Sequence, residues 1–162
     1  MIITVLLGTP LWVWGLLAGL IALGVSQAMT REIAPRRVAL LPAVMLPLSL
    51  LGVLGNFHGE PGALAAWAAG GALAATAAAP LVAPRGAHWS AAARRFHLPG
   101  SWLPLALILA IFGLRYSVGA SLALNPSLAA DRSFAAAASL GFGLCSGLFV
   151  ARALALWKLV RG

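Results

Sequence analysis

The segment from Trp102 to Leu124, WLPLALILAIFGLRYSVGASLAL, contains one charged residue, Arg115. A helix rises about 1.5 Å per residue and therefore needs about 20 mainly apolar residues to cross the hydrocarbon core of a bilayer. The segment satisfies that requirement and predicts a membrane-spanning helix. Lipid is then the expected solvent for the rest of the chain, and its other apolar blocks are interpreted in the same way.

Similar apolar blocks flank this segment on both sides. Including it, they predict spans at about residues 5–29, 38–55, 61–82, 102–124 and 133–157. Of the 162 residues, 62% are hydrophobic and 9% are charged, whereas a soluble domain usually has about 25% charged residues. Ten arginines with one lysine and abundant alanine favour a bacterial source. The sequence therefore predicts one all-α domain, a bundle of five transmembrane helices in a bacterial inner membrane.

The basic residues indicate the orientation of this bundle. Eight of them fall in connectors on one side, and Arg132 falls on the other; the eight are Arg31, Arg36, Arg37, Arg85, Arg94, Arg95, Lys158 and Arg161. Because short loops rich in Lys and Arg stay in the cytoplasm, we expect the N-terminus outside and the C-terminus inside.

The connector of residues 85–100 is the longest polar stretch of the chain. It is expected to lie on the cytoplasmic surface as a short interfacial helix, with Trp89, Ala92 or Ala93, and Phe96 on one face. Its arginines are expected to attract anionic lipid headgroups, by about 1 kcal/mol per charge. Nucleic acid is not an expected partner, because the basic residues lie between apolar blocks rather than as a patch on one folded face.

Arg115 is expected at membrane depth, about 20 Å from the cytoplasmic end of its helix and hence in the outer half of the bilayer. An unpaired cation there costs about 2.5 kcal/mol or more, so its side chain should face the bundle. One hypothesis is that Arg115, Tyr116 and Asp131 form an outward-facing pocket for an anionic group. The alternative is an arginine that is paired for structural reasons or that extends to the membrane surface.

Glycines mark the last predicted span. Gly143 and Gly147 form a GxxxG pattern, which Gly141 extends. Small residues at this spacing let two helix backbones approach closely. The pattern predicts a helix-packing face, which would serve either packing within the chain or association of two copies.

The sequence offers few groups for chemistry. Its histidines, His58, His88 and His97, fall in connectors, and Cys145 lies in an apolar span. Paired carboxylates, Ser/His/Asp spacing, HExxH and a glycine-rich phosphate loop are all absent from the sequence. We therefore expect a protein without enzymatic activity, metal or cofactor. The favoured function is a membrane subunit or scaffold, whose partner would be either a second copy of the chain or another membrane protein. The alternative is a small permease or ligand-binding protein with an outward-facing pocket around Arg115.

Three stretches resemble an uncharacterised family, a domain of unknown function, of small proteobacterial inner-membrane proteins. They are Thr9–Trp14, Arg95–Pro104 and Arg115–Gly119, and the similarity extends over nearly the whole chain. The resemblance implies a multi-span membrane fold. It implies no activity and assigns no catalytic residue.

Overall fold

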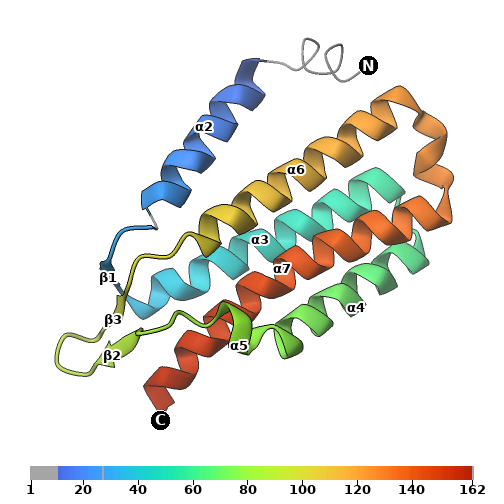
Figure 1. The fold of residues 1–162 in the computed structure, drawn as a ribbon. Coiled ribbons are helices and arrows are strands. Elements are labelled where there is room, and N and C mark those ends of the chain that lie inside the picture. The colour runs from blue at the N-terminus through green and yellow to red at the C-terminus, as the bar shows by residue number, and fades with distance from the viewer. Residues whose placement is uncertain (1–10, 27, 162) are drawn as a thin grey trace.

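The computed structural model describes residues 11–26 and 28–161, which are mostly helical (Figure 1). The longer helices of this part are α2 (Leu11–Ser26), α3 (Pro35–Phe57), α4 (Pro61–Ala77), α6 (Leu103–Leu124) and α7 (Arg132–Arg161). Two short helices complete the set, α5 (Ala79–Val82) and the 3-10 helix η1 (Pro126–Ala130). The prediction of a mainly helical chain is confirmed. Residues 5–10 and 27 of the first predicted span lie outside the described residues.

Within the described residues, three helices are long and apolar enough to cross a membrane. They are Pro35–Phe57, Leu103–Leu124 and Arg132–Val160. The described part of α2 contributes a shorter apolar helix, Val13–Ser26.

The predicted span at residues 61–82 is divided in the structure. Helix α4 has 17 residues and ends before Ala78, and α5 follows it immediately. Pro80 lies at the start of α5, and because proline has no backbone N–H it cannot continue the hydrogen-bond ladder of α4. The proline therefore accounts for the break.

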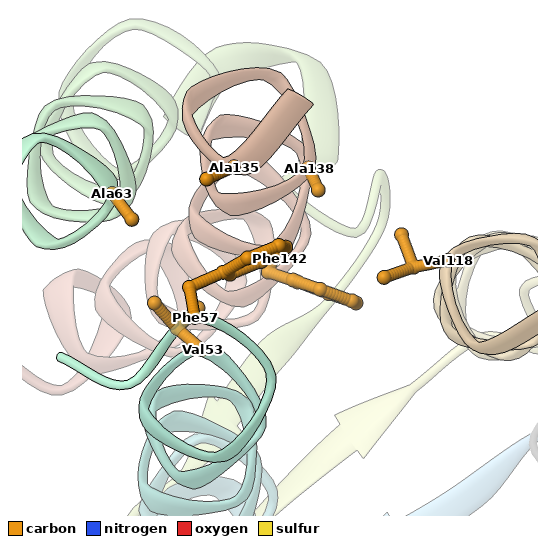
Figure 2. Close-up of a cluster of buried hydrophobic side chains, with 7 residues drawn as sticks. All are labelled: Val53, Phe57, Ala63, Val118, Ala135, Ala138 and Phe142. Atoms are coloured by element: carbon orange, nitrogen blue, oxygen red, sulfur yellow. The ribbon is translucent and has the colours of Figure 1, made fainter. Parts of the chain in front are cut away.

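Helices α4 and α7 pack along each other, and α3 and α6 lie beside α7 (Figure 1). Figure 2 shows the buried cluster at their centre, in which the ring of Phe142 from α7 lies among side chains of α3, α4 and α6. Its members are Val53, Phe57, Ala63, Val118, Ala135, Ala138 and Phe142. Helix α2 packs on α6, where Gly24 lies against Leu105.

The segments around residues 31 and 85–100 form a small antiparallel sheet. Its strands are β1 (Arg31–Ile33), β2 (His88–Ser90) and β3 (Arg95–Leu98), in the order β1-β3-β2. The expectation of an interfacial helix in residues 85–100 is wrong, because this segment contains β2 and β3. The prediction of an all-α domain is incomplete, because it did not include this sheet.

The sequence of β3 explains why this segment is a strand. Phe96 and Leu98 are buried, whereas Arg95 is exposed and His97 partly so, and this period of two is the side-chain alternation of a strand. The turn that returns the chain from β2 to β3 contains Arg94 in the left-handed region, with φ of 49°.

The sheet covers one end of the helix bundle. The buried side chains of Ile33, Phe96 and Leu98 pack against Ala153 and Leu156 near the end of α7, and Figure 1 shows the strands at the end where α3 and α6 begin. The connectors that carry most of the basic residues are thereby held together at that end.

Candidate functional site around Arg115

Arg115 lies near the middle of α6. It follows Leu103 by twelve residues and precedes Leu124 by nine, which places it about 18 Å and about 13 Å from the two helix ends. Ile108 and Val118, which are buried, share its side of the helix by their spacing. The arginine is therefore on a side of α6 that packs on the bundle.

The guanidinium of Arg115 contacts the backbone of α3. Its Nη1 donates a hydrogen bond to the carbonyl oxygen of Leu48, at 3.3 Å. One turn further along α3, a Cβ on Gly52 would lie 2.9 Å from Nη1. The carbonyl of Leu48 supplies the acceptor, and the missing side chain of Gly52 supplies the space.

The space beside Arg115 is small. The residues around it enclose a cavity of about 20 Å³: Met45, Leu48, Ser49, Ile111, Arg115, Phe142 and Ser146. That volume has room for about one water molecule, whereas ligand pockets usually measure about 300–1,000 Å³. The arginine side chain itself is exposed in the described structure, so its other side is open toward the surroundings of the bundle.

The structure does not bring Asp131 to Arg115. The Asp131 carboxylate accepts a hydrogen bond from the backbone N–H of Phe134, at 2.9 Å, and so caps α7. It lines a separate open depression of about 410 Å³ together with His58, Glu60 and Arg132.

Glu60 has the same structural role in that depression. Its carboxylate accepts a hydrogen bond from the N–H of Ala63, at 2.6 Å, at the start of α4. Tyr116, the remaining residue of the predicted pocket, stacks on Phe112 of its own helix, with ring centroids 6.3 Å apart. The three residues predicted to form one pocket therefore lie in different surroundings.

A polar link that was not predicted from the sequence runs through the middle of the bundle. The Nε1–H of Trp67 in α4 donates a hydrogen bond to Oγ of Ser49 in α3, at 3.0 Å. The Ser49 hydroxyl in turn donates to the carbonyl oxygen of Phe142 in α7, at 3.3 Å. These bonds join three helices. The lone serine within the apolar stretch of α3 was the signal that could have identified the link.

The predicted packing glycines lie against other helices of the same chain. A Cβ on Gly143 would overlap the carbonyl of Trp67, and one on Gly147 the carbonyl of Gly71. On α4, a Cβ on Gly70 would lie 2.6 Å from the carbonyl oxygen of Leu140. These positions form the α4–α7 seam, defined here as Gly70, Gly71, Gly143 and Gly147.

Gly141, the third glycine of the predicted face, lies against a different neighbour. A Cβ there would lie 2.9 Å from the side chain of Leu114 on α6. The glycines of α7 therefore serve contacts with two helices of the chain.

The sheet-covered end carries an open basin of about 640 Å³. Arg36 and Arg94 line it with Trp89, Ala34, Pro35 and Ala91. Nearby, the rings of His88 and His97 stack with centroids 4.8 Å apart, and His97 Nδ1 lies 4.0 Å from a carboxylate oxygen of Glu32. Over residues 11–26 and 28–161, no group of three or more His, Cys, Asp or Glu residues is arranged to hold a metal ion.

Comparison with known proteins gives relatives but no activity. The model of a family of unknown function, DUF6622, matches residues 1–162. An uncharacterized protein of Pasteurella multocida (strain Pm70) is 36% identical over 50 residues, which are 31% of this chain and 39% of that protein. The chain therefore matches less than half of the length of this curated relative. No solved structure matches the chain at a significant level.

Proposed function

The chain belongs to DUF6622, a family of unknown function, and on that premise we propose that it is a non-enzymatic subunit or scaffold of a bacterial inner membrane. The resemblance noted in the sequence is thereby confirmed. The helices that could cross a membrane support a multi-pass protein, and the position of the basic residues supports an orientation with the N-terminus outside and the sheet-covered end in the cytoplasm.

One observation carries the proposal. Arg115 lies near the middle of α6, bonded on one side to the backbone of α3 and exposed on the other. Ionisable residues within membrane-spanning helices are rare, and they indicate a functional site when no structural pairing accounts for them. An arginine that is exposed at the side of a bundle suits contact with another membrane protein better than contact with an enclosed ligand.

The packing around this residue supports a structural role. The α4–α7 seam brings two helix backbones together, and Ser49 joins three helices by hydrogen bonds. In lipid, the hydrophobic effect does not drive helices to associate, so close backbone packing and interhelical hydrogen bonds hold them together. The bundle is thus suited to present a fixed surface.

The alternative, a small permease or ligand-binding protein with an outward-facing pocket around Arg115, has less support. Such a pocket needs space for a ligand, and the cavity beside Arg115 measures about 20 Å³. The wider depression at the ends of α3 and α7 contains Asp131 and Glu60, whose carboxylates accept the N-terminal hydrogen bonds of helices.

The proposal is tested by the size of the protein in its own membranes. An epitope-tagged chain, expressed from its chromosomal locus, is extracted in a mild detergent and separated by native electrophoresis. A subunit migrates in a discrete assembly clearly larger than the 16.6 kDa chain in its detergent micelle. The purified chain alone is the size control. Migration of the native protein with this control would contradict the proposal.

A further inference from the structure

We propose that the exposed side of Arg115 binds a transmembrane helix of another protein, which carries a carboxylate at the depth of the guanidinium. The contact surface, called here the Arg115 surface, consists of the exposed residues Arg115, Leu48 of α3 and the neighbouring glycines Gly55 and Gly119. This inference rests on the proposed function, because it names the partner that such a subunit would meet.

The guanidinium of Arg115 has unused hydrogen-bonding capacity. A guanidinium has five N–H donors and no acceptor. Among the described residues, the structure gives Arg115 one hydrogen bond, to the carbonyl oxygen of Leu48, and the adjoining cavity has room for about one water molecule. A carboxylate matches the planar fork of a guanidinium with two parallel bonds and also neutralises its charge.

The position of Arg115 along α6 disfavours a lipid phosphate as the acceptor of its hydrogen bonds. Arg115 lies about 13 Å from the Leu124 end of α6 and about 18 Å from the other end. Helical side chains point toward the N-terminus of their helix, so the guanidinium of Arg115 is directed away from the nearer end. A headgroup at either surface is therefore poorly placed to accept its hydrogen bonds.

A second copy of the chain is poorly placed to supply the carboxylate. The sequence contains three acids. Glu32 lies in β1, Glu60 caps α4, and Asp131 caps α7. All three are at helix ends or in the sheet, so a copy with the same orientation brings no carboxylate to the middle of α6. The acid has to come from a different protein.

The shape of the surface permits a helix to approach. Gly119 follows Arg115 by one turn on α6, and Gly55 follows Gly52 by about one turn on α3. A Cβ at either position would have no other atom within 4 Å, so both glycines are open on their outer side. Small residues beside a polar contact allow close approach of a partner backbone in lipid.

A designed peptide provides the direct test. The probe is a transmembrane peptide of about 20 leucine and alanine residues with one central Asp, and its control has Leu in place of Asp. The protein carries a donor dye on Ala92→Cys in a Cys145→Ala background, each peptide carries an acceptor dye, and energy transfer is measured in phosphatidylcholine vesicles. We expect the Asp peptide to bind at least about tenfold more tightly than the Leu peptide, a preference of about 1.4 kcal/mol.

The preference for Asp should depend on Arg115. It should disappear in Arg115→Met and persist in Arg115→Lys, because lysine keeps the charge. A peptide with a central Lys should bind Arg115→Glu and not the unsubstituted protein, which tests the pairing even where Arg115→Met folds poorly. Equal binding of Asp and Leu peptides, or an Asp preference that survives in Arg115→Met, would overturn the inference.

Native electrophoresis separates this inference from the proposed function. The tagged chain is compared with its Arg115→Met, Arg115→Lys and Arg132→Met variants in their own membranes. Loss of the large assembly in Arg115→Met, while Arg115→Lys and Arg132→Met retain it, supports the inference. An assembly that persists in Arg115→Met overturns the inference and leaves the proposed function standing, whereas the absence of an assembly in the unsubstituted protein overturns the proposed function itself.

Discussion

Gly52 of α3 lies opposite Arg115 of α6, so close that a Cβ on the glycine would be 2.9 Å from the guanidinium Nη1. Glycine within a helix is less favourable than alanine by about 1 kcal/mol. Here the missing side chain lets a cation reach the carbonyl of Leu48. The pair shows how two helices hold an arginine near the middle of an apolar helix without a contact to an acidic residue among the described residues.

Substitution at Gly52 should release Arg115 from α3. A valine at Gly52 would occupy the space of the guanidinium and break its hydrogen bond to Leu48, so we expect Gly52→Val to lower the free energy of unfolding by about 1.5–3 kcal/mol, the usual worth of a charged hydrogen bond. Gly55→Val is the matched control, because a Cβ there meets no other atom within 4 Å. The measurement is unfolding by denaturing detergent, and equal losses in both variants would refute the role of Gly52.

Substitution in the α4–α7 seam should be poorly tolerated. Alanine at Gly143 would press its methyl group on the carbonyl of Trp67, and backbone atoms cannot move aside as a side chain end can. We expect Gly143→Ala to destabilise the protein by about 1–3 kcal/mol, measured by thermal unfolding in detergent. Gly113→Ala on α6 has open space and should be neutral or stabilising. A stable Gly143→Ala variant would contradict close packing of these helices.

The polar link at Ser49 should appear as coupling between two substitutions. Ser49→Ala removes the acceptor of the Trp67 N–H and should cost about 1 kcal/mol. Trp67→Phe removes the donor as well, so in the Ser49→Ala background it should cost less than it does alone. A double-mutant cycle on the free energy of unfolding measures this difference. Strictly additive effects would show that the bond contributes nothing.

The helical part of the fold follows from apolar block length. The segment predicted at residues 102–124 is α6, Leu103–Leu124. A long apolar block between polar connectors has few other ways to form the hydrogen bonds of its backbone N–H and C=O groups in lipid. The break between α4 and α5 was less visible. Pro80 lies near the end of the predicted span at residues 61–82, and a proline alone does not distinguish the end of a span from an interruption within it.

The sheet was missed because its strands are short and because β1 is distant in sequence from β2 and β3. Glu32 of β1 pairs with His97 of β3, and nothing local to either strand indicates the other. The alternation of Arg95, Phe96, His97 and Leu98 was a local signal, but four residues of alternation are also compatible with one turn of an amphipathic helix. Tertiary packing on the end of α7 decides between them.

The site could be predicted only in part for a related reason. Arg115 was identified because a single charge in an apolar block is conspicuous. Its acceptor, the Leu48 carbonyl, is a backbone group that every residue possesses, and the role of Gly52 depends on which helix lies opposite. Such contacts depend on which helices pack together and on how each helix is rotated about its own axis. A single sequence does not specify either.

The basin at the sheet-covered end should bind anionic lipid. Arg36 and Arg94 line it, and each charge near an anionic surface contributes about 1 kcal/mol, or about a fivefold change in affinity. Arg36→Gln and Arg94→Gln should each reduce retention of anionic phospholipid by about fivefold in native mass spectrometry of the detergent-solubilised protein. Arg132→Gln, at the other end of the bundle, is the control. Equal retention by all three variants would contradict a lipid site in the basin.

The most direct measurement concerns the two ends of α6. In a Cys145→Ala background, single cysteines are placed at Ala92, in the turn between β2 and β3, and at Ser127, in η1, and labelled with a membrane-impermeant maleimide. If α6 crosses the inner membrane with its basic end inside, Ser127→Cys is labelled in intact cells and Ala92→Cys only after the inner membrane is permeabilised. Labelling of Ala92→Cys in intact cells would contradict the orientation, and labelling of both cysteines would contradict the crossing itself.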